Sequence, residues 1–138
     1  MFQFVVKRLG FLKRVPLLPI LFDSWIKIWV YFTNKDLAKC IDDIETEVSG
    51  WAGISIALHK YGGTQFNVHK KEIAHIHSNG LLDILFDKKT KEHLLKEGRI
   101  NHHHVFENSG WISFYIKTEG DKDYAVELLR RAYENNVS

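Results

Sequence analysis

His75 and His77 lie one residue apart in the stretch KEIAHIH, and imidazole side chains can act as bases or bind metal ions. The stretch alternates as a β-strand does, so both side chains are expected on the same face of a sheet. The ordinary pKa of histidine, about 6.5, suits a general base near neutral pH. The pair is therefore a candidate for removing a proton from an acidic enol or phenol.

A metal site is the alternative use of these histidines. The chain has eight histidines, and two on a strand with a third from a loop form a geometry that Zn or Fe(II) can use. The HHH run at 102–104 offers the third imidazole, and Asp83 or Glu72 a carboxylate. No HExxH motif or Cys/His spacing of a zinc site accompanies them. We therefore expect no cofactor and no metal, with Zn or Fe as the alternative.

The elements that hold these residues follow from the spacing of apolar side chains. Three segments have helical periodicity, five alternate as strands do, and the segment GRINHHHVFENS has no period and is predicted to be a loop. Short turns between successive strands favour an α+β fold, with a mainly antiparallel sheet of about five strands and helices packed on one face. The predicted helices are 35–48, 88–97 and 121–135, and the predicted strands are 51–59, 64–69, 71–77, 81–86 and 110–116.

Length and composition indicate one ordinary domain. The chain has 138 residues, of which 45% are hydrophobic and 26% charged, close to the average for globular proteins. We divide it into a basic, aromatic N-terminal segment, 1–33, and a single α+β domain, 34–138. Cys40 is the only cysteine, which excludes an internal disulfide and favours a reducing compartment such as the cytoplasm.

The N-terminal segment differs from the rest in charge. Residues 1–32 have a net charge of +4, although the whole chain has only +2, so the remainder offers no broad basic surface for nucleic acid. The apolar run 17–32 is short for a spanning helix and carries two charges. Its aromatic side chains are expected to dock on the domain; the alternative is a peripheral contact of residues 1–32 with a membrane. The side chains at helical spacing are Trp25, Ile28, Trp29 and Phe32.

A small-molecule site is predicted on the sheet face that the helices leave free. Alternation in strands 51–59 and 110–116 separates an aliphatic face from a face that mixes large aromatic, small and polar side chains. Such a mixture is typical of a ligand pocket, here with two tryptophans as walls. The alternative is that the N-terminal segment covers this face as a second core layer. The candidate ligand-binding residues are Trp51, Ser55, His59, Trp111, Ser113 and Tyr115.

Three separated blocks, KEIAHIHSNGLLDILF, EGRINHHHVFENSGWISFYI and AVELLRRAYE, together resemble the luciferase-domain family, which includes the fungal luciferases and many short bacterial proteins of unassigned role. The resemblance covers about residues 50–134. It implies a relation to oxygenases, because the fungal members add dioxygen to an electron-rich hydroxypyrone and release carbon dioxide as light is emitted. Such chemistry needs a base, a dry pocket and orientation of the substrate.

For this chain the resemblance implies a luciferase-like domain that binds a small aromatic or enolic compound. The activity to test is oxygenation without a cofactor, with histidine as the base. A metal-dependent enzyme and a non-catalytic binding or membrane-adaptor module are the alternatives, and no oligomeric state is predicted. The candidate catalytic residues are His75, His77, Asp83, His103 and His104.

Overall fold

The computed structural model describes residues 17–137, which form four α-helices and one six-stranded sheet. Neighbouring strands are antiparallel throughout, in the order β1-β2-β3-β4-β6-β5. This confirms the predicted α+β class. In chain order the elements are α2 Leu18–Thr33, α3 Lys35–Ser49, β1 Ile54–Leu58, β2 Thr64–Val68, β3 Lys71–Ile76, β4 Leu81–Leu85, α4 Lys88–Glu97, β5 Asn101–His102, β6 Trp111–Tyr115 and α5 Gly120–Val137.

Side-chain caps set the ends of two helices where the sequence predicted them. The Asn34 side chain accepts a hydrogen bond from the Leu37 backbone N–H at 3.1 Å and begins α3. Asp87 does the same for the N–H of Thr90 at 2.9 Å and begins α4. Gly98 ends α4 with a φ of 76°, a left-handed conformation that glycine adopts without steric cost.

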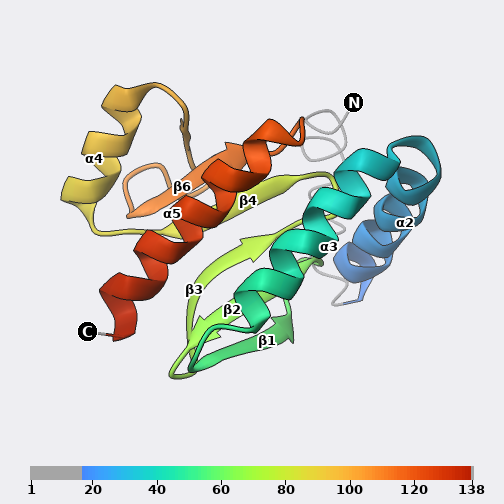
Figure 1. Cartoon of the computed structure of the whole chain (residues 1–138), viewed down its shortest axis with the longest axis horizontal. Coiled ribbons are helices and arrows are strands. Elements are labelled where there is room, and N and C mark those ends of the chain that lie inside the picture. The colour runs from blue at the N-terminus through green and yellow to red at the C-terminus, as the bar shows by residue number, and fades with distance from the viewer. Residues whose placement is uncertain (1–16, 138) are drawn as a thin grey trace.

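The main core lies between the sheet and the pair α3 and α5, which cover the same face of the sheet (Figure 1). Helical spacing turns one apolar face of each helix toward the strands, so the helices leave the other face of the sheet free to form a site. Side chains that are completely buried in this core include Ile44, Val48, Phe66, Ile84, Leu128 and Leu129.

Three strand predictions need correction. Residues 51–53 form a turn, with Gly53 at a φ of 77°, so the first strand begins only at Ile54. Ile56 and Leu58 are exposed, because β1 is an edge strand. The predicted loop contains β5, whose Asn101 pairs with Ser113 of β6. The sequence did not predict β5, because two residues are too few to show a periodicity. With β5 the sheet has six strands instead of the expected five.

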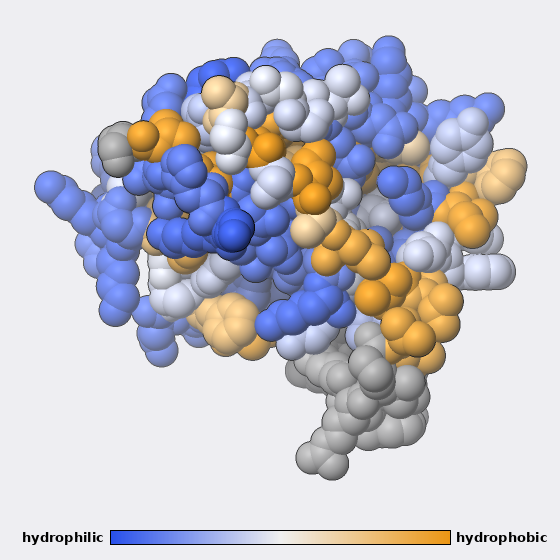
Figure 2. All heavy atoms as spheres, turned by 90° about the horizontal axis from the view of Figure 1, so that it is seen from below, coloured by the Kyte–Doolittle hydropathy of each residue, from blue (hydrophilic) through white to orange (hydrophobic). Residues whose placement is uncertain are grey.

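The expected docking of the aromatic side chains on α2 is wrong. Trp25, Ile28, Trp29 and Phe32 are 66%, 56%, 62% and 73% exposed, and Figure 2 shows hydrophobic side chains gathered on this side of the molecule. Instead, α2 buries Asp23 and Val30 against the domain. Within residues 17–137, no helix combines the length and the apolar character that crossing a membrane requires.

Gly110 is predicted to be essential for the junction of β4 and β6. Its carbonyl accepts the Phe86 N–H at 3.1 Å, and a Cβ at this position would overlap the Phe86 carbonyl oxygen. Gly110→Ala is therefore expected to lower the free energy of unfolding by about 2–4 kcal/mol, measured by urea denaturation. Gly120→Ala is the control, because its Cβ would meet only Thr118 Oγ1 at 3.7 Å. Equal losses in the two variants would contradict this account.

Candidate functional site

A cavity of about 730 Å³ lies on the sheet face that α3 and α5 leave free. Side chains from α2, β3, β4, the loop that follows β5 and the start of β6 line it, together with the turn between β1 and β2. Apolar side chains form most of its wall, while the polar groups converge from β3 and β4. A hollow of this size and composition suits a small molecule.

Strand register places the predicted histidine pair on this face. His75 of β3 lies opposite Asp83 of β4, and Asp83 lies opposite Ser113 of β6. These side chains therefore project from the same side of the sheet as Trp111, two residues before Ser113. The sequence alone did not determine this register.

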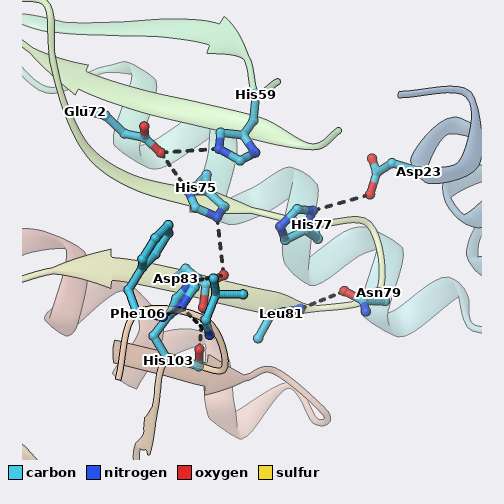
Figure 3. A network of polar contacts seen from close by, with 12 residues as sticks. Asp23, His59, Glu72, His75, His77, Asn79, Leu81, Asp83, His103 and Phe106 are labelled. Carbon is cyan, nitrogen blue, oxygen red and sulfur yellow. Dashed lines mark hydrogen bonds and ion pairs between the residues drawn. The ribbon is translucent and has the colours of Figure 1, made fainter. Parts of the chain in front are cut away.

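His75 is fixed between two carboxylates (Figure 3). Its Nδ1 lies 2.7 Å from Glu72 Oε1, and its Nε2 lies 3.2 Å from Asp83 Oδ2. Trp111 packs beside the ring, with 5.4 Å between ring centres. Since both ring nitrogens face acceptors, His75 has no free nitrogen with which to take a proton from a ligand.

Asp83 is the buried centre of a polar network. Its side chain is 1% exposed; Oδ1 accepts a hydrogen bond from Ser113 Oγ at 2.5 Å, and Oδ2 also lies 3.5 Å from His103 Nε2. Burial alone raises the pKa of Asp83, but the hydrogen bonds of His75 and Ser113 outweigh it and hold the pKa below its usual value. The network therefore holds an ionised carboxylate beneath the cavity.

The position of the proton on His103 follows from its contacts. Its Nδ1 accepts the backbone N–H groups of Val105 at 3.1 Å and Phe106 at 3.0 Å. A neutral ring with Nδ1 as acceptor carries its proton on Nε2, the atom that faces Asp83. Burial lowers the pKa of His103, which favours this neutral form. The Nε2–H of His103 therefore faces the Asp83 carboxylate, at 3.5 Å from Oδ2, an ion-pair distance that is too long for a good hydrogen bond.

His59 is a buried, neutral imidazole in the same cluster. It follows β1, and its ring stacks on His75 with 3.8 Å between ring centres. Burial, and then the neighbouring His75 and His77, lower its pKa to about 4. Its Nε2 lies 3.6 Å from Glu72 Oε1, whereas its Nδ1 is buried without a hydrogen-bond partner among the described residues.

His77 is paired with Asp23, a residue that sequence reasoning missed. The His77 Nδ1 lies 3.7 Å from Asp23 Oδ1, and the same carboxylate accepts the backbone N–H and the hydroxyl of Ser78 at 3.2 and 2.9 Å. Burial raises the pKa of Asp23, but the contacts with His77 and Ser78 outweigh it and lower the pKa. The His77 Nε2 has no hydrogen-bond partner within residues 17–137, and the His77 side chain lines the cavity.

Gly62 explains how Asp23 approaches the sheet so closely. It lies in the turn between β1 and β2 with a φ of 90°, and a Cβ there would overlap the Asp23 side chain. The sequence signal for Asp23 is one acidic residue in a mostly apolar helix. Burying a charged side chain costs free energy, so a buried charge in such a helix usually has a specific partner.

Of the other predicted site residues, some lie at the cavity and some lie outside it. Trp111, Ser113, His103 and His104 lie in or directly beneath the cavity, and His104 is exposed at its edge. Phe106, which was not predicted, stacks on His103 with 5.2 Å between ring centres.

The predicted pair of tryptophan walls is wrong, because Trp51 lies elsewhere. It packs on Tyr133 of α5 with 5.3 Å between ring centres, and the Arg130 guanidinium lies 4.1 Å from its ring centre. Trp51 belongs to a turn, to which strand alternation does not apply. Ser55 and Tyr115 are exposed and do not line the cavity.

The histidines offer two groups that could hold a metal ion. Ligand atoms of His59, His75 and His77 lie within 4.8 Å of one another, as do those of Asp83, His103 and His104. The second group suits a metal poorly, because the Nε2 of His103 carries the proton in the tautomer described above. The first group retains a free nitrogen on His59. It is therefore the better candidate.

His59 is expected to make the stability of the domain depend on pH. Its pKa is about 4 in the folded protein and 6.5 in the reference state, so below pH 6.5 the unfolded chain gains a proton that the folded chain does not. The free energy of unfolding should fall by up to about 3 kcal/mol between pH 6.5 and 4. His59→Asn should reduce this fall in urea titrations above pH 4.5, whereas His93→Asn on α4, at an exposed histidine, should not. An unchanged slope in His59→Asn would contradict the assignment.

Comparison with known proteins gives one match. The family model described as Luciferase domain matches residues 70–132, from the start of β3 into α5. Searches of curated proteins and of solved structures found no match. The matched residues include the network of His75, Asp83 and His103, while Asp23 and His59 lie before them. The chain therefore carries a luciferase-like domain, and the predicted family resemblance is confirmed over residues 70–132.

Proposed function

We propose that this domain binds a small aromatic or enolic compound in the cavity and that His77 removes a proton from it. The observation that carries the proposal is the pair of His77 and Asp23, in which one ring nitrogen faces a buried carboxylate and the other is free at the cavity. The predicted roles of His75 and His103 change accordingly, because their contacts suit them to orient the site rather than to accept the proton.

The contacts of His77 and Asp23 support this proton transfer. The Asp23 carboxylate, 3.7 Å from His77 Nδ1, favours the tautomer with its proton on that nitrogen, which leaves the lone pair of a neutral ring on Nε2. When Nε2 takes the phenol or enol proton, the carboxylate stabilises the imidazolium that forms. The His75 ring stacks on His59 and lies edge-on to His77 with 5.1 Å between ring centres, which limits how the base can turn.

Oxygenation is the reaction that we propose to follow deprotonation. An electron-rich enolate can transfer one electron to dioxygen, and the resulting substrate radical and superoxide combine to form a C–O bond. The product is a peroxide, in which the substrate has lost two electrons and dioxygen has gained them. Since the substrate is itself the reductant, the protein supplies the base and a water-poor pocket.

Binding is tested with a panel of phenols and hydroxypyrones by calorimetry, and oxygen uptake is followed with an electrode. Trp111→Leu should weaken binding about tenfold, because Trp111 lines the cavity beside His75. Trp51→Leu is the matched control, since Trp51 packs on α5 outside the cavity. Equal effects of the two substitutions, or no binding by the intact protein, would contradict the proposed site.

A metal-dependent enzyme is the second candidate function. Three imidazoles within 4.8 Å and the unpartnered Nδ1 of His59 favour it. Metal analysis of protein purified without a histidine tag distinguishes the two candidates. One equivalent of Zn or Fe, lost in His59→Ala, would replace the proposal of a metal-free base.

A further inference from the structure

Helix α2 has an exposed apolar stripe that the fold does not use. Six large side chains recur at steps of three and four residues on the same side of the helix, each at least 42% exposed. Only Asp23 and Val30 of α2 are buried against the domain. We define the α2 stripe as Leu21, Phe22, Trp25, Ile28, Trp29 and Phe32.

A continuous exposed apolar surface of this kind usually marks an interaction site. Single exposed apolar residues are common, but the α2 stripe places two tryptophans and two phenylalanines together, and Figure 2 shows the hydrophobic character of this side. Tryptophan suits the boundary between a membrane and water, because its ring is apolar while its N–H can remain hydrated.

Charge favours a membrane with anionic lipids over a protein partner. Lys27 is the only exposed charged residue of α2, since Asp23 is buried. The chain before α2 contains four basic residues and no acidic residue in its sequence: Lys7, Arg8, Lys13 and Arg14. Basic residues next to an amphipathic aromatic helix are the combination that binds anionic lipid surfaces. We infer that the α2 stripe docks in the interfacial region of an anionic membrane.

The same surface continues into the cavity. Leu21, Phe22 and Trp25 belong to the α2 stripe and also line the cavity. Val105 and Phe106 line it as well and are 58% and 53% exposed; Phe106 lies on the side of His75 away from Asp23 (Figure 3). The cavity therefore has exposed apolar residues from two separate segments at its mouth, and docking of α2 would bring that mouth to the lipid.

A cavity mouth at the lipid surface limits the class of ligand that can enter. This step rests on the proposed function of the cavity. The ligand is amphipathic, with an enol or phenol group beside His77 and an apolar tail that extends between α2 and residues 105–106. Such a compound dissolves in membranes, so entry from the lipid would avoid its transfer through water.

Vesicle co-sedimentation of the full chain tests the docking surface. The probes are vesicles of phosphatidylcholine alone and with phosphatidylglycerol, and the variant is Trp29→Ser with Phe32→Ser, neither of which lines the cavity. Binding to the anionic vesicles should fall tenfold or more in this variant, because both side chains lose their insertion into lipid. The matched control is Ile56→Ser with Leu58→Ser on exposed β1 and should bind as the intact protein does.

The outcomes of this experiment distinguish an anionic membrane from a second copy of the chain as the partner of the α2 stripe. Failure of the intact protein to bind anionic vesicles, or equal losses in the variant and the control, overturns the lipid surface. A dimer in sedimentation analysis that dissociates in the Trp29 and Phe32 variant would assign the α2 stripe to a second copy instead. Both side chains lie outside the cavity, so binding of soluble phenols should persist in this variant. Vesicle binding without phenol binding would therefore reject the proposed function alone.

Ligand length gives an independent readout of the cavity mouth. Octylphenol should bind the intact protein at least tenfold more tightly than ethylphenol, because its tail contacts the apolar rim. Phe22→Ser should remove most of this difference, since Phe22 both lines the cavity and is exposed. Equal affinities for the two phenols in the intact protein would reject the amphipathic ligand.

Discussion

Asp83→Asn is expected to lower the free energy of unfolding by about 3–5 kcal/mol. The Asp83 side chain is buried and faces donors on Ser113, His75 and His103 at the same time. An asparagine cannot accept from all of them, and its NH₂ group would meet another donor, so buried polar atoms would be left unsatisfied.

The measurement is urea denaturation at pH 7.5, with Asp42→Asn as the matched control. Asp42 is exposed on α3, so its replacement should change the free energy of unfolding by less than about 0.5 kcal/mol. The His103 contacts to Val105 and Phe106 do not require Asp83, so the 103–106 loop should lose less order than the His75 ring. A loss in Asp83→Asn no larger than in Asp42→Asn would show that the network contributes little to folding.

His77→Ala is expected to slow oxygen uptake with the best substrate of the phenol and hydroxypyrone panel by about 10²–10⁴-fold, the usual effect of removing a general base. Its Nε2 is the imidazole nitrogen that is free at the cavity, whereas both nitrogens of His75 are occupied. Binding of the neutral ligand should change much less than the rate, because the apolar walls stay in place.

Two controls separate the base from a general disturbance of the site. His93→Ala, at an exposed histidine on α4, should keep the rate of the intact protein. Asp23→Asn keeps the shape but removes the charge that stabilises the imidazolium, so its rate should lie between those of the intact protein and His77→Ala. A His77→Ala rate within a factor of two of the intact protein would exclude His77 as the base.

Local chemistry explains why much of the fold could be predicted. Asn34, Asp87 and Gly98 mark helix ends through contacts within a few residues, and the turns around Gly62 and Gly80 separate strands whose alternation is regular. Each such signal is complete within a short piece of sequence. The antiparallel order of β1 to β4 then follows from the short connections between them.

The candidate site could be predicted only in part, because it depends on contacts between distant segments. Alternation placed His75 and His77 together, but the register that brings Asp83 and Ser113 to the same face is a property of the assembled sheet. Asp23 reaches Ser78 across 55 positions of the chain, and no local pattern encodes that approach. Trp51 was misplaced for the opposite reason, because the alternating pattern extends beyond the strand into a turn.

Burial also changes which histidine can act as a base. The eight histidines look alike in the sequence, yet the fold gives those at the cavity different partners. His59 is held neutral by burial, and His75 is enclosed by Glu72 and Asp83. His103 keeps its proton on Nε2, the nitrogen that faces the Asp83 carboxylate. His77 is left with a carboxylate on one nitrogen and the cavity on the other.

The most direct test is the absorption spectrum of 4-nitrophenol bound to the protein at a pH one unit below the phenol's own pKa. If His77 takes the proton, the intact protein should increase the phenolate band as the cavity fills, and His77→Ala should bind the phenol without this increase. A bound nitrophenol that stays neutral in the intact protein, or ionises equally in His77→Ala, would contradict the account.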